Sequence, residues 1–261
     1  MNLPPNRLKA ALAGHQLQMG LWTCLSSSYS TELLAGSGYD WLTLDMEHSP
    51  NDLATVLGQL QALGGYPVEP VLRLLRFDRD LVKQYLDMGV RTLVLPNVES
   101  ADEARAIVQA TRYPPDGVRG VSGLQRANRW GRISGYHASA PDQLCILAQI
   151  ESAAGIANAG PIAAVEGIDG FFVGPSDLAA SLGHMGQPQQ KQVQAAIAQA
   201  LAAATAAGKG CGILARNAVE AQAYHAMGYC MLGLGTDQGL LAKASDDLVA
   251  QFRDLIAKES A

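Results

Sequence analysis

Charged side chains gather where two apolar runs of the sequence end. Asp45 closes one run and is followed by Glu47 and His48, and Arg73 lies inside another run, 71–75. An imidazole near a carboxylate can exchange protons at neutral pH; the alternative is that Asp45 caps the next turn and His48 is a surface residue. A guanidinium inside an apolar run needs an anion, which is Asp45, Glu47 or a substrate oxyanion. We favour the oxyanion, because such groups often stabilise developing negative charge.

Two further carboxylates, Glu151 and Asp177, follow later apolar runs. Carboxylate oxygens suit Mg²⁺ or Mn²⁺, with water or substrate filling the remaining positions. Each residue alone has a structural alternative: Glu151 as a partnered carboxylate at a strand end, and Asp177 as an acid favoured by a helix dipole. Their occurrence together favours a metal site.

The segment Gly174-Pro175-Ser176 precedes an expected helix. Free backbone N–H groups at a helix start can hold a substrate carboxylate. Ser176 can also serve only as a helix cap.

Some kinds of chemistry lack their residues. No lysine stands at the carboxyl end of an expected strand, and Lys209 lies at the opposite end of one, which disfavours Schiff-base catalysis. There is no G-x-S-x-G segment, and the glycines of 233–239 miss the dinucleotide spacing by one residue. A metal, without an organic cofactor, is therefore the expected catalyst.

The elements that must position these residues repeat one unit, an apolar run followed by a helical pattern. The expected strands are 19–25, 39–44, 70–75, 91–95, 145–150, 170–173, 210–214 and 230–234. Eight such units predict a (β/α)₈ TIM barrel as a single domain, 1–261, after a short N-terminal helix within 1–14. A helix is expected after each strand, among them helices over 153–165 and 218–227, and the last helix is expected over 240–258. In such barrels the active site lies at the carboxyl ends of the strands. The candidate site residues named above would meet there.

Composition excludes several classes of protein. Among 261 residues, 48% are hydrophobic, which excludes disorder, and the net charge of −5 disfavours nucleic acid as a partner. Neither a signal peptide nor a membrane-spanning run is seen, so we expect a soluble, cytoplasmic protein that does not bind membranes. The four cysteines are scattered singly and are expected to be reduced core residues.

Five segments together resemble the HpcH/HpaI aldolase family, in its 4-hydroxy-2-oxoheptanedioate and 2-dehydro-3-deoxyglucarate aldolase branch. They are Trp22, 26–34, 45–51, 149–151 and 174–178. The resemblance extends over nearly the whole chain, including 113–120 and 126–130 in a long segment without clear periodicity.

The resemblance implies a class II pyruvate aldolase on a TIM barrel. Such an enzyme cleaves a 4-hydroxy-2-oxoacid reversibly to pyruvate and an aldehyde. Glu151 and Asp177 match the family's ligands of a divalent metal, Mg²⁺ or Mn²⁺ with Co²⁺ also possible, which pyruvate would chelate. Arg73 matches the arginine that contacts the keto oxygen, and His48 with Asp45 matches a dyad that assists proton transfer. The matching substrate contacts are Gln149, Gly174, Pro175, Ser176, Trp22 and Leu214, with Glu47 as a secondary candidate.

The family also implies a hexamer, a trimer of dimers that exchange the last helix. Met46, Ser176 and 74–76 depart from the family pattern on the aldehyde side, so the resemblance does not name the aldehyde.

Two other functions stay open from the sequence. One is an acyl-CoA ester lyase of the malyl-CoA type, for which Arg126, Arg129 and Arg132 are the only evident cluster for phosphates. The other is a barrel that binds a small acid without turnover, because a fold alone does not prove catalysis.

Overall fold

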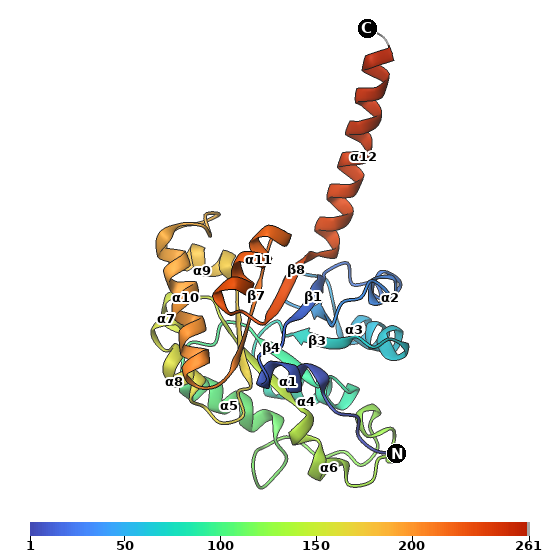
Figure 1. Cartoon of the computed structure of the whole chain (residues 1–261). Coiled ribbons are helices and arrows are strands. Elements are labelled where there is room, and N and C mark those ends of the chain that lie inside the picture. The colour runs from blue at the N-terminus through green and yellow to red at the C-terminus, as the bar shows by residue number, and fades with distance from the viewer. Residues whose placement is uncertain (260–261) are drawn as a thin grey trace.

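Eight parallel strands follow one another around a closed barrel, β1 to β8, in the computed structural model of residues 1–259 (Figure 1). This confirms the predicted TIM barrel; the last two residues of the expected domain, 260 and 261, lie outside the described residues. The strands are β1 (Gln18–Thr23), β2 (Trp41–Asp45), β3 (Glu69–Arg73), β4 (Thr92–Leu95), β5 (Cys145–Ile150), β6 (Gly170–Val173), β7 (Gly210–Leu214) and β8 (Met231–Thr236).

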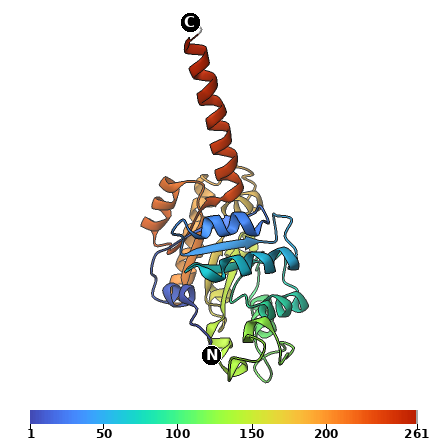
Figure 2. The ribbon, with the colours of Figure 1, turned by 90° about the vertical axis from the view of Figure 1, so that its right-hand side faces the viewer.

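Helices lie around the outside of the strands and join their ends (Figures 1 and 2). They are α1 (Arg7–Ala13), α2 (Ser28–Ala35), α3 (Leu53–Ala62), α4 (Arg79–Met88), α5 (Ala101–Thr111), α6 (Tyr136–Ser139), α7 (Ala153–Ala157), α8 (Ala159–Ala163), α9 (Pro175–Ser181), α10 (Lys191–Ala206), α11 (Ala218–Met227) and α12 (Asp237–Glu259). Three short 3₁₀ helices are η1 (Leu63–Gly65), η2 (Arg126–Asn128) and η3 (Pro141–Gln143).

The strands are apolar on both faces, and each face has its own core. Leu42, Leu72 and Leu93 belong to the outer core, beneath the surrounding helices. Trp41 and Phe172 belong to the inner core, which fills the barrel. Burial of apolar surface in these two layers stabilises the barrel, as expected for parallel strands covered on both sides.

The N-terminal helix α1 closes the barrel where the strands begin. Its Leu8 and Leu12 are buried and belong to the inner core. Asn6 caps this helix and also donates from Nδ2 to Thr92 Oγ1 at 3.0 Å, next to the start of β4. The opposite end of the barrel, where the strands finish, is left open for a site.

One predicted helix was wrong. The segment 153–165 forms two short helices, α7 and α8, that meet at Asn158. The Asn158 side chain donates to the carbonyl oxygen of Glu99 at 2.8 Å, a contact between distant segments. Asn158 thus ends one helix and begins the next.

The last helix, α12, begins at Asp237 and extends away from the barrel (Figures 1 and 2). Its residues 238–259 are exposed, among them Leu241, Leu248, Phe252 and Leu255, whose spacing places them on one face. Among residues 1–259, no helix is both long and apolar enough to cross a membrane.

Candidate active site

A cavity of about 250 Å³ lies at the carboxyl ends of the strands and contains most of the predicted site. The predicted residues that line it are Trp22, Asp45, His48, Arg73, Gln149, Gly174, Pro175, Ser176, Asp177 and Leu214. Four others, which the sequence did not assign to the site, are Cys24, Phe172, Thr236 and Gln238. We call this cavity the mouth cavity.

Arg73 is held by two carboxylates at the wall of the mouth cavity. Its Nε and Nη2 donate to the two oxygens of Asp45 at 2.8 and 2.7 Å, and its Nη1 lies 2.8 Å from Glu47 Oε2. Burial alone would lower the pKa of Arg73, but the hydrogen bonds and negative charge of Asp45 outweigh it, so the pKa is raised. The guanidinium also lies 4.4 Å from the centre of the Trp22 ring. The structure thus shows the carboxylate pairing that the sequence left as an alternative.

Asp45 does not pair with His48, which corrects the expected dyad. The buried Asp45 carboxylate accepts from Arg73 and from the backbone N–H of Glu47 at 3.0 Å, and it contacts the Cys24 thiol at 3.7 Å. Across residues 1–259 no hydrogen bond joins Asp45 to His48, whose side chain is exposed. The reason is register: Asp45 is the strand neighbour of Arg73, so the guanidinium reaches both carboxylate oxygens first.

Glu151, one residue beyond β5, is buried with both carboxylate oxygens engaged. Oε1 accepts from the backbone N–H of Asn97 at 2.9 Å, and Oε2 accepts from Gln149 Nε2. Burial raises the pKa of Glu151, and the charge of Asp177 adds to that rise, against the lowering effect of both hydrogen bonds. Asp177 lies exposed in the first turn of α9, and its carboxylate accepts no hydrogen bond from any described residue.

The charges around the mouth cavity suit a divalent cation. Burial raises the pKa of Glu47 to about 7; Arg73 opposes this rise, and the charges of Glu151, Asp45 and Asp177 add to it. These four carboxylates thus repel one another around a single guanidinium, and a divalent cation would relieve that repulsion.

Two geometric details also fit a cation beside Glu151. The buried Oε1 of Gln149 has no hydrogen-bond partner among the described residues. A side chain at Gly174 would place its Cβ 2.5 Å from Glu151 Oε2, so the glycine leaves this carboxylate its space. Within residues 1–259 no group of three or more His, Cys, Asp or Glu could hold a metal. Glu151 and Asp177 are the predicted ligands of a cation here, with water or substrate in its other positions.

Asp237 joins the start of α12 to the rim of the mouth cavity. Its Oδ1 accepts from the backbone N–H of Cys24 at 2.8 Å, and its Oδ2 accepts from that of Leu25 at 3.2 Å. Thr236 and Gln238, on either side of Asp237, lie in the cavity wall. The two hydrogen bonds of Asp237 hold them there. Burial raises the pKa of Cys24 to about 12, so this thiol stays protonated at neutral pH.

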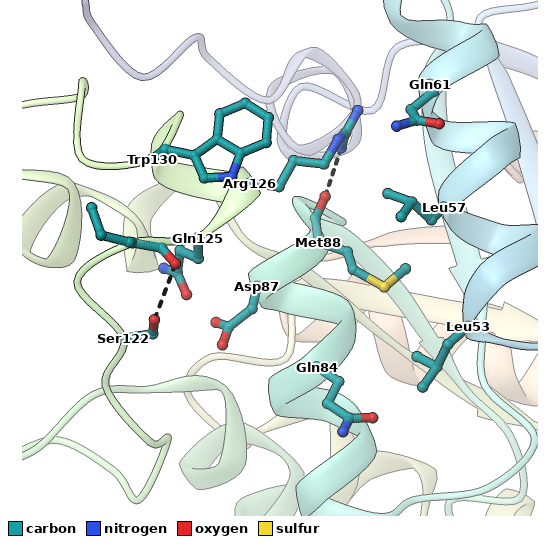
Figure 3. A pocket seen from close by; sticks show the side chains of 11 residues that line it. Leu53, Leu57, Gln61, Gln84, Asp87, Met88, Ser122, Gln125, Arg126 and Trp130 are labelled. Carbon is teal, nitrogen blue, oxygen red and sulfur yellow. Dashed lines mark hydrogen bonds between the residues drawn. The ribbon is translucent and has the colours of Figure 1, made fainter.

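A larger cavity of about 560 Å³ lies between α3, α4 and the long segment before β5 (Figure 3). Leu53, Leu57 and Met88 line it, with Trp130 on the far side, and none of the predicted site residues does. The chemistry inferred from the sequence therefore belongs to the smaller mouth cavity.

The chain is similar to known proteins in both sequence and structure. Residues 18–244 match the family model of the HpcH/HpaI aldolase/citrate lyases. The chain is 49% identical to the hydroxypyruvate/pyruvate aldolase of Deinococcus radiodurans, covering 100% of this chain and 95% of that one. It is 51% identical to the 4-hydroxy-2-oxo-heptane-1,7-dioate aldolase of Shigella sonnei, with 95% of each covered. A crystal structure of an HpcH/HpaI aldolase/citrate lyase family protein from Burkholderia cenocepacia J2315 superposes with a TM-score of 0.93, at 42% identity over 95% of this chain and 99% of that one.

Proposed function

The chain belongs to the HpcH/HpaI aldolase/citrate lyase family, and from this premise we propose that it is a divalent-metal-dependent pyruvate aldolase. It is thus a carbon–carbon lyase that cleaves a 4-hydroxy-2-oxoacid reversibly to pyruvate and an aldehyde. The observation that carries the proposal is that Arg73 and Asp177 line the mouth cavity, while the buried Glu151 lies directly behind its wall, bonded to the lining residue Gln149 and next to Gly174.

Glu151 and Asp177 are the proposed metal ligands. The ion, Mg²⁺ or Mn²⁺, would supply positive charge that stabilises the enolate oxygen of pyruvate. Gln149 holds Glu151 in place through its Nε2, and the absent side chain at Gly174 leaves room beside Oε2.

Arg73 is the proposed partner of the keto oxygen. Asp45 engages its Nε and Nη2, so the guanidinium is fixed before substrate arrives and loses little freedom on binding. Helix α9 begins at Pro175, and the backbone N–H groups of the next two residues, Ser176 and Asp177, have no acceptor within the helix. These two N–H groups are the proposed site of the pyruvate carboxylate.

In cleavage, a base removes the proton of the C4 hydroxyl and the C3–C4 bond breaks. Its electron pair forms the C2–C3 double bond, while the π pair of the C2 carbonyl moves to the oxygen. The aldehyde leaves, and a proton added at C3 gives the methyl group of pyruvate. His48 lies at the rim of the mouth cavity and is the residue we assign to this proton transfer. It acts there without a hydrogen bond to Asp45.

Trp22, Phe172 and Leu214 form the apolar wall of the mouth cavity, and Thr236 and Gln238 form a polar edge. The apolar residues would contact the methyl group of pyruvate, and the polar edge would contact the aldehyde oxygen.

The exposed apolar face of α12 supports a homo-oligomer in which this helix packs on a neighbouring subunit, in the exchanged dimers and hexamer that the family implies. A cytoplasmic location also stays a prediction.

The acyl-CoA alternative loses the support of two of its three arginines. Arg126 and Arg129 line a cavity where the strands begin, at the opposite end of the barrel from the mouth cavity. They cannot hold the phosphates of a CoA ester that reacts at Arg73.

Proton exchange at the pyruvate methyl group tests the proposal without a choice of aldehyde. In D₂O, ¹H NMR should show loss of the methyl signal when Mg²⁺ or Mn²⁺ is present, and EDTA should stop it. Glu151→Gln and Asp177→Asn should each abolish exchange, whereas Glu166→Gln, a matched change at an exposed carboxylate outside the cavity, should not. Exchange that persists in both ligand variants would overturn the metal assignment.

A further inference from the structure

A second polar cavity lies at the opposite end of the barrel. It has a volume of about 370 Å³ and lies between the segment before α1, the connection from α3 to β3, and η2. Glu69 begins β3 and Arg91 directly precedes β4, so this cavity borders the edge where the strands start. We call it the foot cavity. It shares no lining residue with the mouth cavity among residues 1–259.

The foot cavity has a charge opposite to that of the chain. Four arginines, Arg7, Arg91, Arg126 and Arg129, line it against one carboxylate, Glu69, although the chain as a whole carries a net charge of −5. A concave surface lined by one sign of charge raises the local concentration of the opposite ion. The lining therefore favours an anion.

Two of the four guanidinium groups are fixed in the wall. Arg91 donates from Nη2 to both oxygens of Glu69 at 3.0 Å. Arg126 donates from Nη1 to the carbonyl oxygen of Met88 at 2.6 Å, at the end of α4 (Figure 3). Because these groups are already oriented, they lose little freedom when a ligand binds.

The other two guanidinium groups, on Arg7 and Arg129, are exposed. Neither makes a hydrogen bond or an ion pair with any part of the chain that the structure describes. Burial lowers the pKa of Arg126, and the nearby positive charge of Arg129 lowers it further. Arg129 has φ of 54°, a left-handed conformation that is uncommon outside glycine and asparagine. The chain thus holds the like charges of Arg126 and Arg129 near each other, in the turn that ends η2.

We propose that the foot cavity binds a small anion with more than one negative charge, a phosphorylated or polycarboxylated metabolite. Planar guanidinium donors match the oxygens of phosphate and carboxylate groups in pairs. Arg91 and Arg126 form the fixed wall, and Arg7 and Arg129 close on the ligand from the exposed side. The site is separate from the mouth cavity and does not depend on the proposed aldolase reaction.

Isothermal titration calorimetry of the full chain tests this proposal, with inorganic phosphate and citrate as separate titrants. The titrations use constant ionic strength and EDTA, so that neither general screening nor a bound metal contributes. We expect saturable binding of at least one titrant at one site per chain, and the preferred titrant distinguishes a phosphoryl from a carboxylate ligand.

The double variant Arg7→Gln/Arg129→Asn should weaken this binding roughly tenfold or more. Asparagine is chosen at 129 because it tolerates the left-handed conformation. Arg105→Gln, which removes an exposed guanidinium on α5 outside the cavity, should leave binding within about twofold and is the matched control. Thermal melting and pyruvate exchange of the double variant should match the parent. Absence of saturable binding by both titrants, or equal binding by the double variant, would overturn the proposal.

Discussion

Replacing Gly174 with alanine would displace Glu151 without removing any proposed ligand. The backbone of Gly174 has φ of −99° and ψ of 92°, which alanine can adopt. The new Cβ would lie 2.5 Å from Glu151 Oε2 and 3.2 Å from Glu151 Cβ. An ordinary carbon–oxygen contact is about 3.3–3.6 Å, so the carboxylate must retreat by roughly 1 Å.

A displacement of about 1 Å at a reacting centre can reduce the rate about 100-fold, and loss of support for a metal ligand weakens metal binding about 10- to 100-fold. We therefore expect the pyruvate exchange rate of Gly174→Ala to fall about 100-fold, with a higher metal concentration at half-maximal rate. The unfolding temperature should also fall, because the displaced carboxylate is buried and the shift disturbs both of its hydrogen bonds, so exchange is measured below that temperature.

Gly160→Ala in α8 is the matched control, since a Cβ there would meet no atom within 4 Å. It should exchange pyruvate at the parent rate. A Gly174→Ala variant with the parent rate and the parent metal requirement would refute the placement of Glu151 at the metal.

Three further results are expected. Asp45→Asn should lower the free energy of unfolding by about 3 kcal/mol in urea titrations, because it leaves the buried Arg73 without its main partner; a loss under about 1 kcal/mol would contradict the burial argument. The folded-state pKa of Glu47, about 7, is above its ordinary value of 4.5, so the folded state binds this proton more tightly. Its contribution to stability is then complete below about pH 4.5 and is lost as the pH rises through 7 in metal-free protein. Glu47→Gln should flatten that pH dependence in thermal melts, and an unchanged slope would count against the shift. Phe252→Lys should reduce the oligomer mass measured by light scattering, whereas Ala250→Lys, on the opposite face of α12, should not; equal masses for both would exclude packing through the apolar face.

The sequence predicted the elements well where local pattern alone decides them. The strand predicted over 210–214 and the helix predicted over 218–227 match β7 and α11 residue for residue. The single helix predicted over 153–165 failed, because Asn158 bonds to the distant carbonyl of Glu99, and no local pattern contains that contact.

The same distinction applies to the site. From the rule that sites lie at the carboxyl ends of strands, the sequence predicted that Asp45, Arg73 and Asp177 share one site. All three line the mouth cavity. It could not decide which carboxylate would engage Arg73, because that depends on register across the sheet. Gln238 was missed because the apolar pattern predicts that the last helix begins at residue 240, whereas α12 begins at Asp237. The helix begins there because Asp237 bonds to the backbone just after β1, a distant contact.

That bond gives α12 a mechanical role at the mouth cavity. The helix has 23 residues and so a length of about 34 Å, and it is anchored at one end beside Cys24 and Gln238. Because the bond joins the two, a displacement of the far end of α12 would be transmitted to the rim where substrate enters. A neighbouring subunit that holds the far end would stiffen this rim, and by mass action that support disappears on dilution. Specific activity should then fall as the enzyme is diluted below the dissociation constant of the oligomer, while an activity independent of concentration would show that the rim is rigid by itself.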